Sequence, residues 1–113
     1  MKITIDEASK ILYKGGVIAI PTETVYGLAA DATNEKAINK IFKIKNRPTD
    51  NPLICHFHSF DDAKRFLSHY PKYMEQLVAM FSPGPVSYLL PLKMPSSLQA
   101  ATRGNAHVII RIP

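Results

Sequence analysis

The sequence predicts a single α/β domain in which an open mixed sheet is flanked by helices. Short apolar runs rich in Val and Ile alternate along the chain with segments whose apolar residues recur at helical spacing. Gly, Pro and Asn separate most of these segments. Alternating strands and helices are typical of layered α/β domains. A chain of 113 residues with 46% hydrophobic content can bury one core, so we expect one domain over residues 1–113.

The first predicted helix begins at Thr4 or Asp6, since either side chain can cap it. The glycines at 15–16 permit the left-handed conformation that commonly ends a helix. The apolar residues between these signals follow helical spacing and are Ile5, Ala8, Ile11 and Leu12.

The second predicted helix begins after Asn34, which can cap it. Pro48 disfavours helical geometry at the residue before it, so this helix must end near Asn46. Further helices are expected around residues 61–68 and 72–81. The apolar stripe of the second helix contains Ala37, Ile38, Ile41 and Phe42.

Residues 17–20 are all apolar and end at Pro21, which predicts a short strand buried on both faces. A loop is expected after it. The prolines at 83, 85, 91 and 95 indicate irregular crossings rather than a doubly wound sheet. At least three further strands are predicted, over residues 53–57, 86–90 and 108–112.

Net charge and cysteine content indicate which partners and which cell compartment to expect. The net charge of +5 favours anionic partners such as nucleotides or RNA. The lone Cys55 rules out an internal disulfide, and residues 1–10 lack the apolar run of a signal peptide or membrane helix. We therefore expect a cytoplasmic protein with no membrane partner.

Lys45 and Arg47 are the first candidate site residues. If the chain leaves the second helix extended at Asn46, residues two apart project to the same side, and both cations face one point. Arg47 offers a planar fork and Lys45 a mobile charge, a combination that suits phosphate. Alternatively, both cations simply complement the negative end of the helix.

Thr22, Glu23, Thr24 and Tyr26 occupy the turn after the first strand. Ligands of open α/β sheets gather at the carboxyl ends of strands, so these side chains can serve a small polar substrate. An ordinary Thr-rich turn is the alternative. Asn51 precedes Pro52 and is therefore held extended, which exposes its amide for hydrogen bonding; otherwise it simply forms a turn.

The cluster Cys55, His56 and His58 suggests a metal site, but its spacing argues against one. Alternation along a strand places Cys55 on one face and both histidines on the other. Zinc needs two further ligands, and the sequence offers none nearby, so no metal is expected here. Cys55 is then an inert core residue.

Arg111 interrupts the apolar run VIIRIP. A guanidinium in a buried strand is costly unless an anion pairs with it, so a substrate carboxylate or phosphate is one partner to consider. The alternative is an arginine at the strand end that extends to water.

The motifs PTETVYGL, KIKNRPTDNPL, PGPVSYLL and VIIRIP together resemble the YrdC-type threonylcarbamoyl-AMP synthases. The resemblance covers nearly the whole chain but only the first part of the family's domain. It implies that family's twisted open sheet (YrdC/RibB-like). Family members continue to a Ser-x-Asn segment that is absent here, so we expect a C-terminally truncated domain, either a fragment or a shortened relative.

By this resemblance, the chain belongs to enzymes that convert L-threonine, bicarbonate and ATP to L-threonylcarbamoyl-AMP and pyrophosphate, with Mg²⁺, in the first step of tRNA threonylcarbamoyladenosine modification. Lys45 and Arg47 would act on the phosphates. The threonine contacts would be Thr24, His56 and Arg111. The nucleotide contacts would be Arg47, Lys45, Asn51, Ser87 and His107, with support from Thr22, Glu23 and Tyr26.

Two of these positions depart from the family. Ser87 and His107 stand where relatives usually or often have Thr, and the hydroxyl is kept only at Ser87. We expect this chain alone to be a poor catalyst and to expose apolar surface or an open strand edge near residues 108–112. Other hypotheses are a non-catalytic basic module that binds tRNA or double-stranded RNA beside other tRNA-modification proteins, and a hydrolase or regulatory domain related to carbamoyl transfer.

Overall fold

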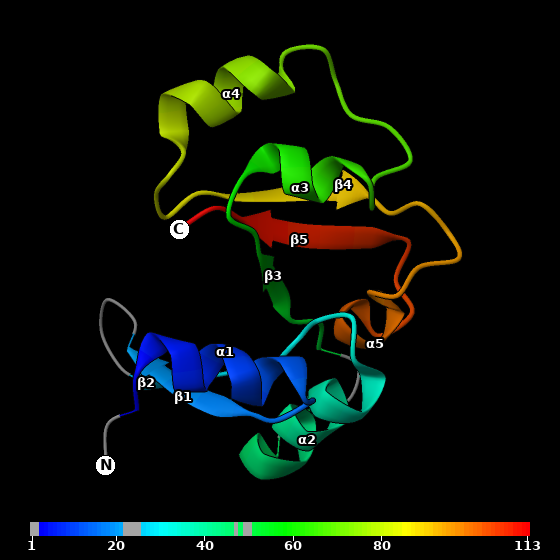
Figure 1. Ribbon diagram of the computed structural model, residues 1–113. Coiled ribbons are helices and arrows are strands. Elements are labelled where there is room, and N and C mark those ends of the chain that lie inside the picture. The colour runs from blue at the N-terminus through cyan, green and yellow to red at the C-terminus, as the bar shows by residue number, and fades with distance from the viewer. Residues whose placement is uncertain (1–2, 22–25, 47, 49–50) are drawn as a thin grey trace.

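The computed structural model describes the chain except for residues 1–2, 22–25, 47 and 49–50 and the side chains of residues 21 and 26. It has five helices and five strands among the described residues (Figure 1). An α/β fold with a mixed sheet is confirmed. No helix in the described part of the chain is long and apolar enough to span a membrane.

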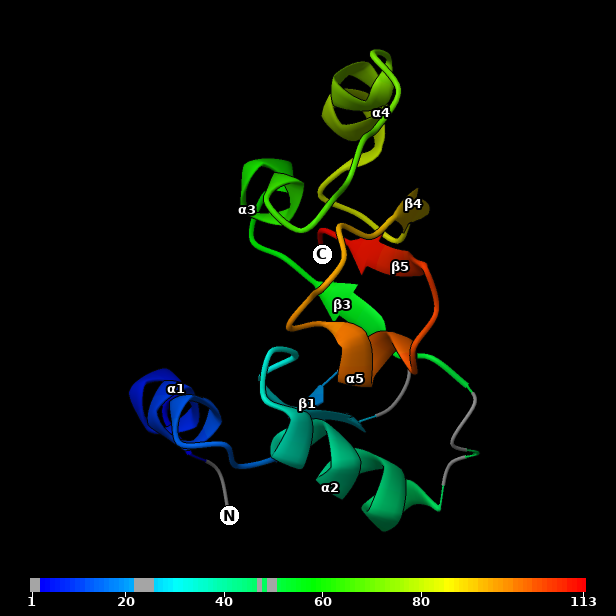
Figure 2. The ribbon, with the colours of Figure 1, turned by 90° about the vertical axis from the view of Figure 1, so that its right-hand side faces the viewer.

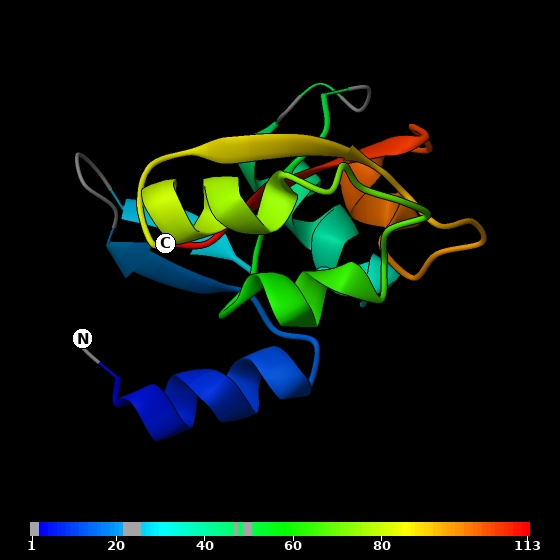
Figure 3. The ribbon, with the colours of Figure 1, turned by 90° about the horizontal axis from the view of Figure 1, so that it is seen from above.

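Helix α1 (Ile5–Tyr13) begins at Thr4, the first of the two caps that the sequence offers. The Thr4 Oγ1 accepts a 3.1 Å hydrogen bond from the amide of Glu7, whose carboxylate accepts one from the Thr4 amide in return. Gly15 follows with φ of 85°, the left-handed stop that was predicted. No α1 residue is buried, and Figure 3 shows the helix lying along one side of the molecule.

Strand β1 (Ile18–Pro21) pairs antiparallel with β2 (Tyr26–Ala29) in a separate sheet of two strands. The predicted strand is confirmed in place, but burial on both faces is wrong: Ile18 is buried whereas Ala19 is exposed. A two-stranded ribbon has too few neighbours to cover both faces. Part of the expected loop is β2, which the sequence hides because YGLA has no β-branched residue.

Helix α2 (Glu35–Lys45) confirms the predicted cap, since the Asn34 Oδ1 accepts a 3.0 Å hydrogen bond from the Ala37 amide. The helix ends at Asn46, as expected, but this residue is left-handed, with φ of 49°. The extended exit assumed for Lys45 and its neighbour is therefore wrong. The buried residues are those of the predicted stripe, Ala37, Ile38, Ile41 and Phe42.

A second sheet contains β3 (Ile54–His56), β4 (Ser87–Pro91) and β5 (His107–Arg111), in the order β3-β5-β4. Strand β5 is central, parallel to β3 and antiparallel to β4. All three strands were predicted. The expected open edge at residues 108–112 is wrong, because β5 is paired on both sides.

The remaining helices are α3 (Phe60–Lys64), α4 (Met74–Phe81) and the short α5 (Gln99–Thr102). The first two were predicted, with longer bounds; the single turn of α5 was not. Lys64 forms ion pairs with Asp61, at 2.9 Å, and with Glu75, which ties α3 to α4. Figure 2 shows β3, β4 and β5 in the middle of the molecule, with α4 and α3 toward one end and α5, β1 and α2 toward the other.

The two faces of the second sheet differ in burial. Alternate residues such as Cys55 and Ile110 point into a core that also receives Leu98, which is 1% exposed. Their neighbours on the opposite face stay open, with Ile54 at 42% and Leu89 at 66% exposed. The apolar surface expected near the C-terminal strand is thus an open sheet face.

A matched pair of leucines tests this division. Leu98→Ala should lower the free energy of unfolding by about 2–5 kcal/mol, because it leaves a cavity in the core. Leu89→Ala removes the same atoms from the open face and should cost about 0.5 kcal/mol or less. Urea unfolding followed by circular dichroism measures both values. Equal losses would contradict the assignment of the two faces.

Candidate functional site

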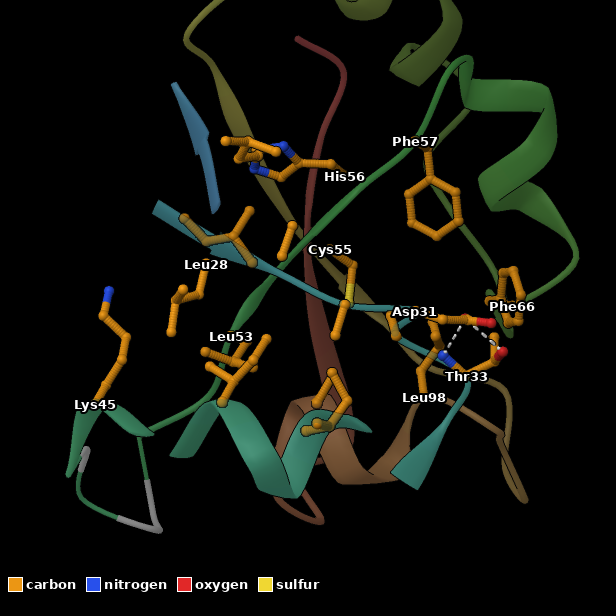
Figure 4. A pocket seen from close by; sticks show the side chains of 18 of the residues that line it. Leu28, Asp31, Thr33, Lys45, Leu53, Cys55, His56, Phe57, Phe66 and Leu98 are labelled. Carbon is orange, nitrogen blue, oxygen red and sulfur yellow. Dashed lines mark hydrogen bonds between the residues drawn. The ribbon is translucent and has the colours of Figure 1, made fainter. Parts of the chain in front are cut away.

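A cleft of roughly 530 Å³ lies between the β1-β2 hairpin, α2 and β3. Figure 4 shows its lining side chains, with Lys45 at one side and Asp31 and Phe66 at the other. Most of the wall is apolar and includes Leu28, Ile41 and Leu53. Apolar walls with a few polar groups are typical of sites for small molecules.

On the Asp31 side of the cleft, the Asp31 carboxylate is hydrogen-bonded within its own turn. The Asp31 Oδ1 accepts hydrogen bonds from the Thr33 amide at 2.9 Å and from the Thr33 hydroxyl at 2.7 Å. The rings of Phe57 and Phe66 lie beside each other with their centroids 5.7 Å apart. This Asp-x-Thr turn was not singled out in the sequence, although such turns have a recognisable pattern.

Lys45, on the other side, is the last residue of α2 and is exposed. It lines the cleft, so its ammonium can reach a ligand there. Its position in the last turn also suits the alternative role of complementing the helix dipole. Arg47 lies outside the described residues, and so do Thr22, Glu23, Thr24 and the side chain of Tyr26.

Three of the predicted site residues come together on the second sheet. Arg111 is opposite Ser87 on β4 and opposite His56 on β3. Directly paired residues project to the same face, so these side chains form one line across the sheet, here called the polar row. His56 and Arg111 end two parallel strands, where open α/β sheets place their ligands. His56 also lines the cleft, whereas Arg111 and Ser87 are not part of its wall.

Arg111 is half-buried rather than fully buried, because it lies on the open face of the sheet. Its Nε and Nη2 donate hydrogen bonds to the Ser87 Oγ, at 3.1 Å and 2.9 Å. No carboxylate of the described residues lies within ion-pair distance of the Arg111 guanidinium. The ion pairs found between described residues are those of Lys64 with Asp61 and Glu75. Among the described residues, the guanidinium is therefore held by a neutral group, the Ser87 hydroxyl.

The histidine and the cysteine of β3 have opposite environments. Two effects lower the pKa of His56 and favour a neutral imidazole. The larger is partial loss of water around the ring, and the smaller is the positive charge of Arg111. Because the side chain remains exposed, solvent screening limits this effect. Cys55 points into the core, and burial raises its pKa to about 11. Its prediction as a core residue is confirmed.

The other predicted contacts lie apart from the polar row. Asn51 is exposed in the turn before β3, and its backbone N–H donates a hydrogen bond to the Pro48 carbonyl at 3.2 Å. His107 pairs with Pro91 at the far end of β5, about 13 Å from Arg111 at the usual rise of a strand. Within the described part of the chain, no three His, Cys, Asp or Glu residues are grouped to hold a metal ion.

The apolar walls of the cleft were missed as site residues. Leu28 belongs to the unpredicted β2, and Ile41 belongs to a stripe that the sequence marks only as buried. Helical periodicity identifies which face is apolar but not what that face meets.

The lowered pKa of His56 predicts a pH dependence of stability. The folded state binds the proton less readily than the unfolded state, so the free energy of unfolding should fall as pH drops below the ordinary value of 6.5. His56→Gln should flatten this slope at pH values below about 6.5. His58→Gln, an exposed histidine outside the row, is the control and should keep it. Urea unfolding across this range provides the measurement, and identical slopes in both variants would refute the interpretation.

Comparisons with known proteins agree with this architecture. Residues 10–113 match the family model Sua5_yciO_yrdC, described as telomere recombination. The chain is 41% identical over 106 residues to a threonylcarbamoyl-AMP synthase of Pyrococcus abyssi, covering 94% of this chain and 31% of that one. The corresponding Bacillus subtilis synthase is 38% identical and is covered over 32% of its length. The chain thus spans about a third of these relatives.

Solved structures show the same relation. The structure of P. abyssi Sua5 complexed with L-threonine has a TM-score of 0.89 and 38% identity, over 100% of this chain and 34% of that one. The MTH1692 protein of Methanobacterium thermoautotrophicum has a TM-score of 0.74 and 30% identity, over 57% of its length. Since the family model matches nearly all of the sequence and these structures share its fold, the chain belongs to the Sua5/YciO/YrdC family.

Proposed function

We propose that this chain carries the threonine- and nucleotide-binding part of a threonylcarbamoyl-AMP synthase, which forms L-threonylcarbamoyl-AMP from L-threonine, bicarbonate and ATP and releases pyrophosphate and water. The observation that carries the proposal is the polar row beside the cleft, where the Arg111 guanidinium lies next to His56 and has no ion pair among the described residues. The names of the relatives and the L-threonine in the P. abyssi Sua5 structure support it.

The amino acid would lie across the polar row with its carboxylate on Arg111. A guanidinium recognises a carboxylate through paired hydrogen bonds, and the half-buried setting strengthens them. The neutral imidazole of His56 can then accept a hydrogen bond from the substrate's hydroxyl or ammonium group. Thr24 would supply the remaining threonine contact, with Thr22, Glu23 and Tyr26 in support.

The chemistry demands positioning more than a protein nucleophile. The threonine amine first has to form a carbamate with bicarbonate, with loss of water, and the carbamate oxygen must then approach the α-phosphorus in line with the departing pyrophosphate. Lys45 and Arg47 would offset the charge that moves onto the phosphates, and Asn51 and His107 would contact the nucleotide. The described residues contain no acidic cluster for Mg²⁺, so the ion would enter on the triphosphate, where it neutralises charge.

The product would serve tRNA modification in the cytoplasm together with other tRNA-modification proteins. The net charge of +5 is favourable for contact with tRNA or double-stranded RNA.

Calorimetry with L-threonine and ATP, added separately and together, tests the proposed function. We expect L-threonine to bind in preference to L-valine, which has the same shape but lacks the hydroxyl. ATP should give a separate binding heat when it is added alone. Rejection of the isostere by a polar site is expected because its partner would be left unpaired. Equal binding of both amino acids, or binding of RNA alone with a steep salt dependence, would contradict the proposal and favour a basic RNA-binding module.

The two cations predict a second result. Lys45→Ala and Arg47→Ala should each weaken ATP binding about tenfold or more while leaving the thermal midpoint nearly unchanged, because charge-assisted contacts to phosphate would be lost. Arg47→Lys should also weaken binding, since it loses the fork. Lys43→Ala is the control, as this residue is an exposed lysine in the same last turn of α2. If it matched Lys45→Ala in both affinity and stability, the helix-dipole role would be the correct one.

A further inference from the structure

We propose that Ser87 is a positioning residue for Arg111 and not a contact to the nucleotide. Its hydroxyl holds one edge of the guanidinium so that the other edge faces the substrate carboxylate. This inference rests on the proposed function, because it states how the carboxylate site of the same reaction is built.

The geometry of the two hydrogen bonds carries the inference. The Ser87 Oγ accepts from Nε at 3.1 Å and from Nη2 at 2.9 Å, which are the two nitrogens of one edge of the guanidinium. Two bonds to one oxygen fix the direction in which this edge of the group faces. A guanidinium has five N–H donors, so three remain, and Nη1 and Nη2 together form the second edge.

This second edge suits a carboxylate, which accepts two parallel hydrogen bonds from an arginine. Ser87 reaches Arg111 from the β4 side, whereas His56 flanks it on the β3 side and also lines the cleft. An amino acid with its carboxylate on Arg111 can therefore extend over His56 toward the cleft. Arg111 would thus meet the carboxylate of such a ligand, and His56, the next residue of the polar row, would meet the groups that follow it.

The neutral charge of the hydroxyl matters as much as its position. An aspartate at position 87 would orient Arg111 equally well but would also neutralise it, as Asp61 and Glu75 do to Lys64. Serine orients the guanidinium without competing for its charge. Holding the long side chain in advance also reduces the rotamer entropy that a ligand would otherwise have to remove.

Substitution at position 87 in the full chain tests the inference by calorimetry. Ser87→Ala should weaken L-threonine binding about tenfold, the size expected for hydrogen bonds to a charged group, and should leave ATP affinity unchanged. Ser87→Thr keeps the hydroxyl and is the matched control, which should bind like the wild type. L-threoninamide lacks the carboxylate, so its affinity should be the same for the wild type and for Ser87→Ala.

A double-mutant cycle separates positioning from a general structural effect. In an Arg111→Ala background, Ser87→Ala should cause no further loss of L-threonine affinity, because the group that it positions is already absent. Additive losses would overturn the inference. Reduced ATP affinity with intact threonine affinity in Ser87→Ala would overturn it as well and would make Ser87 a nucleotide contact.

Nuclear magnetic resonance of the arginine Nε–H groups keeps this inference separate from the proposed function. We expect the Arg111 Nε–H to exchange slowly with water in the ligand-free wild type and faster in Ser87→Ala. If the wild type binds no L-threonine, the proposed function fails, and the exchange rates still decide whether Ser87 holds Arg111. Equal exchange rates in the two proteins would refute the proposal that Ser87 positions Arg111.

Discussion

The pairing of β5 with both of its neighbours is the constraint on which the rest of the structure depends. Val108 and Ile110 are fully buried on one face of this strand, and their burial fixes the register of the sheet. Arg111 must then project to the opposite, open face, directly between Ser87 and His56. A slip of one residue would bury the guanidinium and expose the core, so the packing of the core and the geometry of the candidate site are set together.

The same alternation gives neighbouring residues opposite chemistry. Cys55 and His56 are adjacent in the chain, but burial raises the thiol pKa to about 11, whereas enclosure and the nearby Arg111 lower the imidazole pKa. Both groups are consequently uncharged near neutral pH, which leaves Arg111 as the charged member of the polar row. An anionic ligand at this place meets one oriented cation instead of a diffuse basic surface. This arrangement is consistent with a site that recognises a carboxylate by geometry.

Local signals in the sequence predicted much of the fold. The caps at Thr4 and Asn34 and the buried stripe of α2 depend on residues within a few positions of each other, and each was confirmed. Strand β2 was missed because its stability comes from pairing with β1 rather than from its own composition. The left-handed conformation of Asn46 was also missed, although asparagine tolerates it well.

For the candidate site, the sequence by itself determined which residues have suitable chemistry: the cations near the end of α2, a histidine after a buried cysteine, and an arginine in an apolar strand. Only the tertiary structure decided which of them meet. His56, Ser87 and Arg111 are distant in the chain and become neighbours through strand pairing, whereas His107 lies on the same strand as Arg111 but at its opposite end. Contacts of this kind depend on register and strand order, which are properties of the whole sheet and not of any local segment.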